Sequence, residues 1–189
     1  MVLLYTNTMH KWLREGKQTK ITKDIKKLAN TFKDEGLGYL KEILIWYKDN
    51  LQIKKENIHI HDPNFFTRSA EQIIKSKYLI AGCADEAIFF VTLARAKKIP
   101  ASYIETVHKK SIAGKRIILH GHVFSRVFLK NKTYLVNPAK DIISDKEDFG
   151  EYEPITEGLD SIDIGIKNLK DLRNSYLKYK KEKPYKASI

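Results

Sequence analysis

The sequence predicts an α+β protein, in which helices come first and an antiparallel sheet follows. Apolar residues recur at helical spacing up to about residue 97, whereas residues 101–136 are rich in β-branched and aromatic side chains. Helices and strands that occupy separate parts of a chain are typical of this class. We expect N-terminal helices and a central buried helix packed on the sheet.

Composition indicates one folded domain over residues 1–189. Hydrophobic residues make up 42% of the chain, which is enough for a sizeable core. No apolar run approaches the roughly 20 residues that span a bilayer, and no basic residues precede the short apolar start as in a signal peptide. The single cysteine, Cys83, excludes an internal disulfide and a zinc site of four cysteines. These features predict a cytoplasmic protein without a membrane contact.

The net charge of +12 comes mostly from lysine. Such a surplus occurs in proteins that bind nucleic acid or an acidic partner, and also in proteins with a generally lysine-rich surface. Here the lysines are interleaved with Glu and Asp, and no nucleic-acid motif accompanies them. The sequence therefore favours a lysine-rich surface over a nucleic-acid partner, and it does not indicate an oligomeric state.

The first half of the chain predicts several helices. Residues 1–35 have a helical pattern with a helix start at Thr22, and residues 37–50 predict a second helix after a glycine break. Residues 51–66 are irregular, and Thr67 is expected to cap a third helix. The buried stripe of the first segment comprises Trp12, Leu13, Ile25, Leu28, Ala29 and Phe32.

A long apolar helix then begins near Cys83 and ends at Ile99-Pro100. Residues 101–107, 117–129 and 132–136 predict strands, with a tight turn at Lys130-Asn131 between the last two. Residues 142–163 have a mixed, loop-rich pattern, and a C-terminal helix is expected at about 166–181. That helix would bury Leu169, Leu172, Tyr176 and Tyr179.

Cys83 follows Gly82 at the expected helix start. The free N–H groups of a helix N-terminus favour negative charge, so they would stabilise a thiolate there and an oxyanion on a substrate. Asp85 and Glu86 also suit a helix start, but their charges would oppose a nearby thiolate. A cysteine in this position has the chemistry of a nucleophile, although a free cysteine is also a common buried apolar residue.

A histidine and an asparagine on the predicted hairpin have the chemistry of a base for this nucleophile and of a group that orients the base. His120 and His122 share one face of their strand because they are two residues apart. If Lys130 and Asn131 form a two-residue turn, Leu129 pairs with Lys132 and Asn137 lies diagonal to His122 on that face. Asn137 would then bind one ring nitrogen of His122 and leave the other for Cys83.

These residues resemble the transglutaminase-like domain, a member of the papain-like fold, over about residues 69–141. The core of such a domain would occupy about residues 37–145, with the helix at 37–50 similar to the upstream helix of the family. In the family the third residue is usually Asp, where this chain has Asn, and the position of Phe124 is more often Trp. The similar segments are Gly82-Cys83-Ala84-Asp85-Glu86-Ala87, Leu93-Ala94-Arg95-Ala96, Ile99-Pro100-Ala101, Gly121-His122-Val123-Phe124-Ser125-Arg126-Val127 and Leu135-Val136-Asn137-Pro138.

The resemblance implies a Cys-His-Asn triad of Cys83, His122 and Asn137 that forms a thioester with a protein or peptide substrate. Hydrolysis of a peptide or carboxamide bond is the favoured outcome, and cross-linking of glutamine side chains or deglycosylation are the family's other reactions. Gln72 and His120 are candidates for oxyanion or supporting roles, and no cofactor is expected.

Two other hypotheses remain open at the level of sequence. The same fold could serve as an inactive binding module whose basic surface holds an acidic partner. Alternatively, imidazoles in His59-Ile60-His61-Asp62 and His120-Gly121-His122 could bind a metal ion, although their spacing matches no standard zinc pattern.

Overall fold

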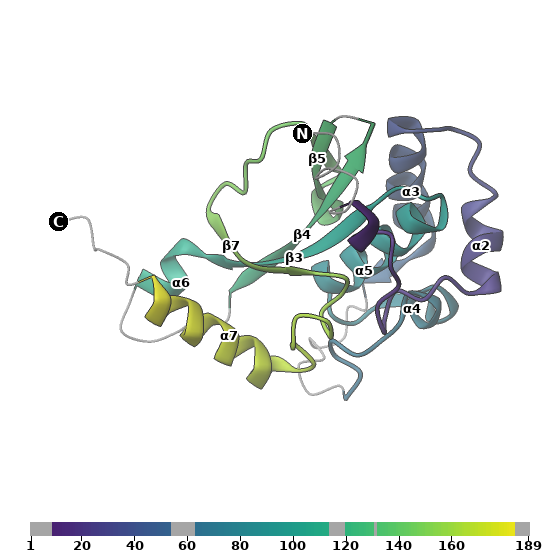
Figure 1. Ribbon diagram of the computed structural model, residues 1–189. Coiled ribbons are helices and arrows are strands. Elements are labelled where there is room, and N and C mark those ends of the chain that lie inside the picture. The colour runs from purple at the N-terminus through teal and green to yellow at the C-terminus, as the bar shows by residue number, and fades with distance from the viewer. Residues whose placement is uncertain (1–8, 54–62, 114–119, 131, 184–189) are drawn as a thin grey trace.

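The computed structural model describes residues 9–53, 63–113, 120–130 and 132–183. These residues form a five-stranded antiparallel sheet with helices packed on it (Figure 1). Helices occupy most of the first half of the chain and strands most of the second, so the predicted α+β class is confirmed. Within the described ranges, no helix has the length and apolar character needed to cross a membrane.

The sheet has the strand order β6-β5-β4-β3-β7. The strands predicted at 101–107 and 132–136 are present with nearly the same bounds, and part of the strand predicted at 117–129 lies outside the described residues. The five strands are β3 (Ala101–His108), β4 (Gly121–Leu129), β5 (Lys132–Asn137), β6 (Ile142–Ser144) and β7 (Tyr152–Gly158).

The loop-rich prediction for residues 142–163 was wrong where it overlooked β6 and β7. Strand β7 lies at the edge of the sheet and is mostly half-buried, so it lacks a clear apolar alternation. It also contains Pro154, a residue that edge strands tolerate because one side of the strand has no partner. The sequence signal for this strand was therefore weak, although it pairs along most of β3.

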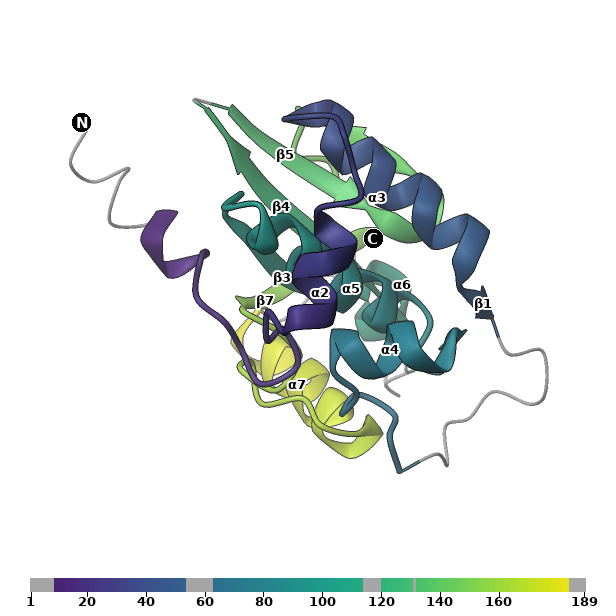
Figure 2. The ribbon, with the colours of Figure 1, turned by 90° about the vertical axis from the view of Figure 1, so that its right-hand side faces the viewer.

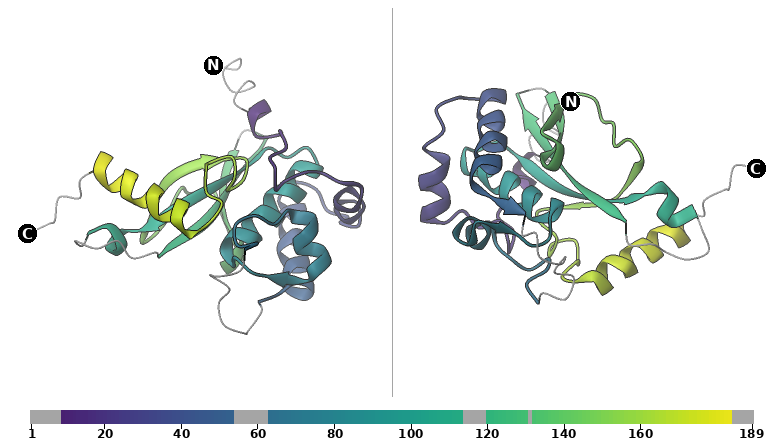
Figure 3. Two further views of the ribbon diagram at one scale, coloured as in Figure 1. Left: turned by 90° about the horizontal axis from the view of Figure 1, so that it is seen from below. Right: turned by 180° about the vertical axis from the view of Figure 1, so that it is seen from behind.

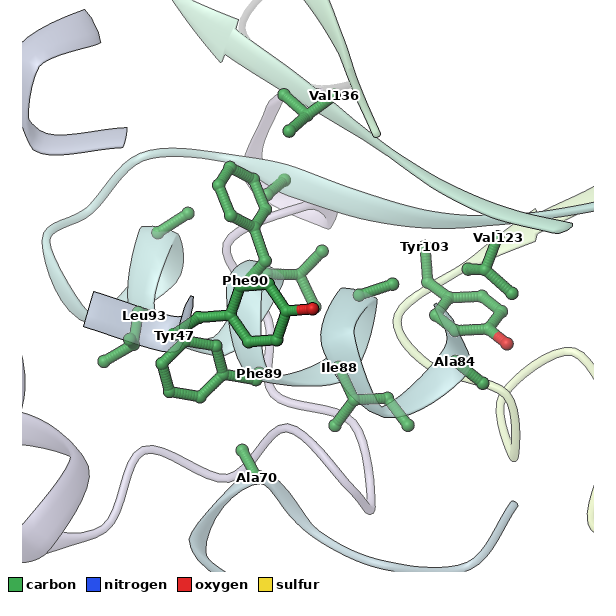
Figure 4. Packing of buried hydrophobic residues seen from close by; sticks show 14 of the residues in the cluster. Tyr47, Ala70, Ala84, Ile88, Phe89, Phe90, Leu93, Tyr103, Val123 and Val136 are labelled. Atoms are coloured by element: carbon green, nitrogen blue, oxygen red, sulfur yellow. The ribbon is translucent and has the colours of Figure 1, made fainter. Parts of the chain in front are cut away.

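The predicted central helix is α5 (Cys83–Ala96), and almost all of its residues are buried. It packs on β3 and β4, while helices α2 (Lys23–Ala29), α3 (Leu37–Asn50) and α4 (Ala70–Ser76) surround its other sides (Figure 2). In Figure 4, Phe90 points from α5 toward Val136 of the sheet, and Ile88 leaves the helix on the opposite side. This enclosure explains why the helix is apolar on most sides.

Two details of the N-terminal helices differ from the prediction. Residues 1–35 are not one helical stretch: within the described part, a single turn at 9–11 precedes α2. The chain between them is irregular because Gln18 is buried and its side-chain amide donates to the carbonyls of Phe66 and Arg68, both at 3.1 Å. Long-range contacts thus override local helical spacing here, while Thr22 caps α2 as predicted.

The cap of α4 is Ser69 rather than Thr67. Ser69 Oγ accepts the N–H of Gln72 at 3.3 Å, and Gln72 Oε1 accepts the N–H of Ser69 at 2.8 Å. This reciprocal pair is a capping box, and it satisfies two N–H groups at once. The hydroxyl of Thr67 instead donates to the carbonyl of Pro63 in the preceding turn.

The predicted C-terminal helix is α7 (Leu169–Glu182), which follows β7 and lies beside it, away from the helices around α5 (Figure 3). It buries Leu172, Tyr176 and Tyr179, as expected from their spacing. A short helix, α6 (Lys109–Ala113), follows β3 and was not predicted. One cluster of buried apolar residues extends from Ile25 to Tyr179. The assignment of residues 1–189 to one domain remains a prediction.

Candidate active site

Cys83 is the first residue of α5, as the sequence predicted, and its side chain is half-buried. Gly82 precedes it with φ +48° and ψ −119°, a backbone conformation that residues with a Cβ rarely adopt. The glycine therefore allows the chain to turn sharply into the helix. This turn presents the Cys83 side chain at the helix N-terminus.

A buried ion pair holds the loop that precedes Cys83. Asp85 Oδ2 accepts the N–H groups of Ile80 at 2.7 Å and Ala81 at 3.0 Å, and it pairs with Arg68 Nη2. Arg68 also donates to the carbonyl of Tyr78 at 2.7 Å. The carboxylate of Asp85 is thus neutralised by Arg68 and used to shape the loop. Its expected opposition to a thiolate is correspondingly weakened.

Glu86, the second acidic residue of this turn, is also buried. Its Oε1 accepts a hydrogen bond of 2.5 Å from the hydroxyl of Tyr47 in α3, and burial raises its pKa. Unlike Asp85, Glu86 belongs to the carboxyl groups that raise the pKa of the Cys83 thiol. The sequence expectation of an opposing charge therefore holds for Glu86.

His122 and Asn137 are in direct contact. Leu129 pairs with Lys132, and Ser125 pairs with Val136, which is the register that a two-residue turn requires. His122 Nε2 lies 2.8 Å from Asn137 Oδ1. Because this amide oxygen is an acceptor, Nε2 carries the ring hydrogen and Nδ1 keeps its lone pair. The contact predicted from turn geometry is present.

The Cys83 thiol lies beside the backbone that directly follows His122. The N–H of Val123 acts on the sulfur and lowers its pKa, as does the N–H of Cys83 itself. Figure 4 shows Val123 and Tyr103 near Ala84 in the first turn of α5. A second connection runs through Tyr152 of β7, whose ring centroid is 5.4 Å from that of His122 and whose pKa is raised by burial and by the charge of Cys83.

The thiol of Cys83 and the imidazole of His122 are both neutral near pH 7. Burial, followed by the charges of Glu105 and Glu86, raises the pKa of Cys83 to about 12. Burial also lowers the pKa of His122; Asn137 acts in the opposite direction, and Lys140 and His120 add to the decrease. The thiolate expected from the helix N-terminus is thus not the resting form. Attack by the sulfur therefore requires a base that takes the thiol proton as the new bond forms.

The two supporting candidates differ in position. Gln72 is exposed on α4, and its side-chain oxygen is used in the capping box with Ser69. His120 stacks on His108 with ring centroids 4.6 Å apart, and its charge contributes to the lowered pKa of His122. His120 therefore belongs to the surroundings of His122. An oxyanion role for either residue remains a prediction.

Sequence reasoning missed a buried polar cluster behind the thiol. Glu105 is 2% exposed, and it lies near the hydroxyls of Tyr103 at 3.1 Å and Tyr176 at 3.4 Å. The signal was a single charged residue inside an otherwise uncharged strand, Ala101-Ser102-Tyr103-Ile104-Glu105-Thr106-Val107. Tyr152 had no such signal because its strand, β7, has no clear apolar alternation in the sequence.

A pocket of about 170 Å³ opens beside Asn137. Its apolar walls include Phe124, Leu135 and Phe149, and Lys140 and Asp148 add one charge of each sign. The ring of Phe124 packs edge-on to His122, with centroids 5.0 Å apart, so Phe124 contacts the histidine and also lines the pocket.

The metal hypothesis receives no support from the part of the chain that the structure describes. Among those residues, no group of three or more His, Cys, Asp or Glu side chains could hold a metal ion. The candidates His59, His61 and Asp62 lie outside the described residues.

No protein-family model matches the chain, and no curated protein matches it in sequence. Its structure is similar to that of a candidate cysteine protease from Cytophaga hutchinsonii, with a TM-score of 0.63 and 16% sequence identity. The two proteins share a fold. The alignment covers 84% of this chain and 50% of the other, so this chain spans about half the length of that structure. At this identity, the similarity concerns the fold alone.

Proposed function

We propose that the protein is a transglutaminase-like cysteine hydrolase that cleaves a peptide or carboxamide bond through a thioester on Cys83. One observation carries the proposal: the hydrogen-bonded pair of His122 and Asn137 lies next to the strand backbone that meets a half-buried cysteine at a helix start. A cysteine, a base and a group that orients the base are the parts that nucleophilic acyl transfer requires. The shared fold with a candidate cysteine protease is compatible with this chemistry.

In the proposed reaction, Nδ1 of His122 takes the thiol proton while the sulfur attacks the carbonyl carbon. The tetrahedral intermediate collapses when His122 returns that proton to the leaving amine, and the thioester remains on Cys83. Water, deprotonated by His122, then attacks the thioester and releases the carboxylic acid, and the thiol is restored. Asn137 keeps the imidazole oriented through both steps. The backbone N–H of Cys83, at the N-terminus of α5, is our candidate for one oxyanion donor.

A peptide pool offers a direct test of this proposal. We would incubate the full chain with the pool and a fluorescent primary amine, and identify new termini and amine adducts by mass spectrometry. We expect cleavage by the wild-type chain and none by Cys83→Ser. Asn137→Ala should cleave about 10- to 100-fold more slowly, part of the ~10²–10⁴-fold that general acid–base catalysis contributes.

The outcomes separate the competing functions. Amine adducts in place of cleavage would identify cross-linking as the reaction. Equal cleavage by Cys83→Ser would show that the site does not act through the thiol. Neither cleavage nor adducts, from a folded wild-type chain, would favour the inactive binding module.

A further inference from the structure

The carboxyl group of Glu105 is the buried ionisable group that acts most strongly on the nucleophile and has no part in the proposed reaction. The charge of Glu105 raises the pKa of the Cys83 thiol more than the charge of Glu86 does. Glu105 pairs in register with Val123, the residue whose N–H meets the sulfur. The side chain of Val123 belongs to the same buried cluster as those of α5. Directly paired residues of an antiparallel sheet place their side chains on the same face, so Glu105 lies on the face of the sheet that α5 covers.

The surroundings of Glu105 hold its carboxyl group without neutralising it. Tyr103 of β3 and Tyr176 of α7 donate hydrogen bonds to it, and its charge acts on the thiol of Cys83 at the start of α5. Its partner on β7 is the uncharged Thr156, and its partner on β4 is Val123. In the described part of the chain, no Lys, Arg or His is among the groups that shift its pKa.

Burial without a cation makes the protonated form the stable one at neutral pH. Burial raises the pKa of Glu105 to about 8, and the hydrogen bonds from Tyr103 and Tyr176 limit the increase. The carboxyl group therefore gains its charge over the pH range in which a cysteine enzyme normally becomes more reactive. A negative charge that appears near the sulfur opposes the formation of a second negative charge there.

We propose that Glu105 is a proton-dependent positioning residue behind Cys83: its neutral form allows the sulfur to ionise during attack, and its carboxylate opposes that ionisation. The site then has a built-in alkaline limit, and helix α7 takes part in setting it through Tyr176. The consequence for catalysis rests on the proposed function. The effect of Glu105 on the chemical reactivity of Cys83 does not depend on the proposed function, so this effect can be tested separately.

The test compares the rate of alkylation of Cys83 by iodoacetamide in the full chain and in Glu105→Gln, from about pH 6 to pH 10. Glutamine has nearly the shape of the neutral carboxyl group, so the variant should fold at neutral pH. We expect similar rates at the acid end, where Glu105 is neutral in the wild type. Above about pH 8 the variant should react faster, by about tenfold for each unit by which the carboxylate of Glu105 raises the pKa of the thiol.

Two matched variants test whether the effect belongs to the buried carboxyl group itself. Glu182→Gln removes the same charge from an exposed position on α7 and should leave the rates unchanged. Tyr176→Phe removes one hydrogen bond that lowers the pKa of Glu105, so it should shift the change in rate to higher pH. In a Glu105→Gln background, Tyr176→Phe should have no such effect.

Superimposable pH profiles for the wild type and Glu105→Gln would overturn the proposal. If Glu105→Gln does not fold, an unshifted profile for Tyr176→Phe would overturn it instead. A shifted alkylation profile in a chain that cleaves no peptide would leave the role of Glu105 intact and refute the proposed function.

Discussion

Asn137 determines how firmly His122 holds a second proton. Its amide oxygen orients the ring at 2.8 Å but carries no full negative charge, so it supports the imidazolium less than a carboxylate would. Burial lowers the pKa of His122 further. The imidazole is therefore available as a base at neutral pH, but the charged form that develops during attack is poorly stabilised.

Replacing Asn137 with Asp should raise the pKa of His122, because an ionised carboxylate then faces Nε2. The acid limb of any pH–rate profile should move to higher pH, since the base must be neutral to accept the thiol proton. Titration of the His122 ring protons by nuclear magnetic resonance measures the shift directly. The Asn137→Ala variant is the control, and an unchanged titration of His122 in Asn137→Asp would show that the contact is absent in solution.

The residues of the site differ in how visible they are in the sequence. The contact between His122 and Asn137 followed from one assumption about the turn after Leu129, because strand register is simple arithmetic once a turn is fixed. The position of Cys83 followed from the glycine before it and the apolar helix after it. Glu105 could not be placed near the sulfur, since its proximity depends on how α5 lies on the sheet.

At the scale of elements, the start of α5 depends on the pairing of Arg68 with Asp85. Both side chains are almost fully buried, and the carboxylate holds two N–H groups of the loop before Cys83. Such a pair contributes little when compared with apolar residues of the same shape, but removal of one partner leaves an isolated buried charge. Its main role here is to fix the path of the chain into the helix.

Asp85→Asn should therefore destabilise the protein by about 3–5 kcal/mol, the cost of leaving a buried charge without its partner. Urea unfolding of the full chain measures this change. The exposed Lys75, which pairs with Asp24 and Glu71, offers the control: Lys75→Gln should change stability little, because solvent screens exposed pairs. A loss for Asp85→Asn as small as that for Lys75→Gln would contradict the role assigned to the pair.

Element prediction succeeded where packing and local signals agreed. The bounds of α3 and α5 follow from apolar spacing and from the glycines and proline at their ends. It failed for residues 12–22 and for β7, where buried hydrogen bonds or an edge position decide the structure. The cap of α4 shows the same limit on a small scale, because Thr67 and Ser69 are chemically similar and only the reciprocal bond with Gln72 selects Ser69.

For the whole molecule, the buried groups around the thiol make stability depend on pH. Glu105 has its pKa raised from 4.5 to about 8 in the folded chain. The folded state thus binds a proton that the unfolded state releases above about pH 4.5. The contribution of Glu105 to stability is therefore largest below that pH and is lost as the pH rises to about 8. His122 acts with the opposite sign. Its lowered pKa means that stability is lost as the pH falls below 6.5.

The difference in the free energy of unfolding between the wild type and Glu105→Gln isolates the contribution of Glu105. Each unit of pKa shift corresponds to about 1.4 kcal/mol, so the wild type should lose a few kcal/mol relative to the variant as the pH rises from about 4.5 to 8. The thiol of Cys83 also has a raised pKa in the folded chain. Its contribution to stability is lost only above its ordinary pKa of 9.0, which lies outside this pH range. Urea unfolding at several pH values gives the difference curve. A flat curve would mean that Glu105 is already ionised, and therefore hydrated or paired with a cation, in the folded protein.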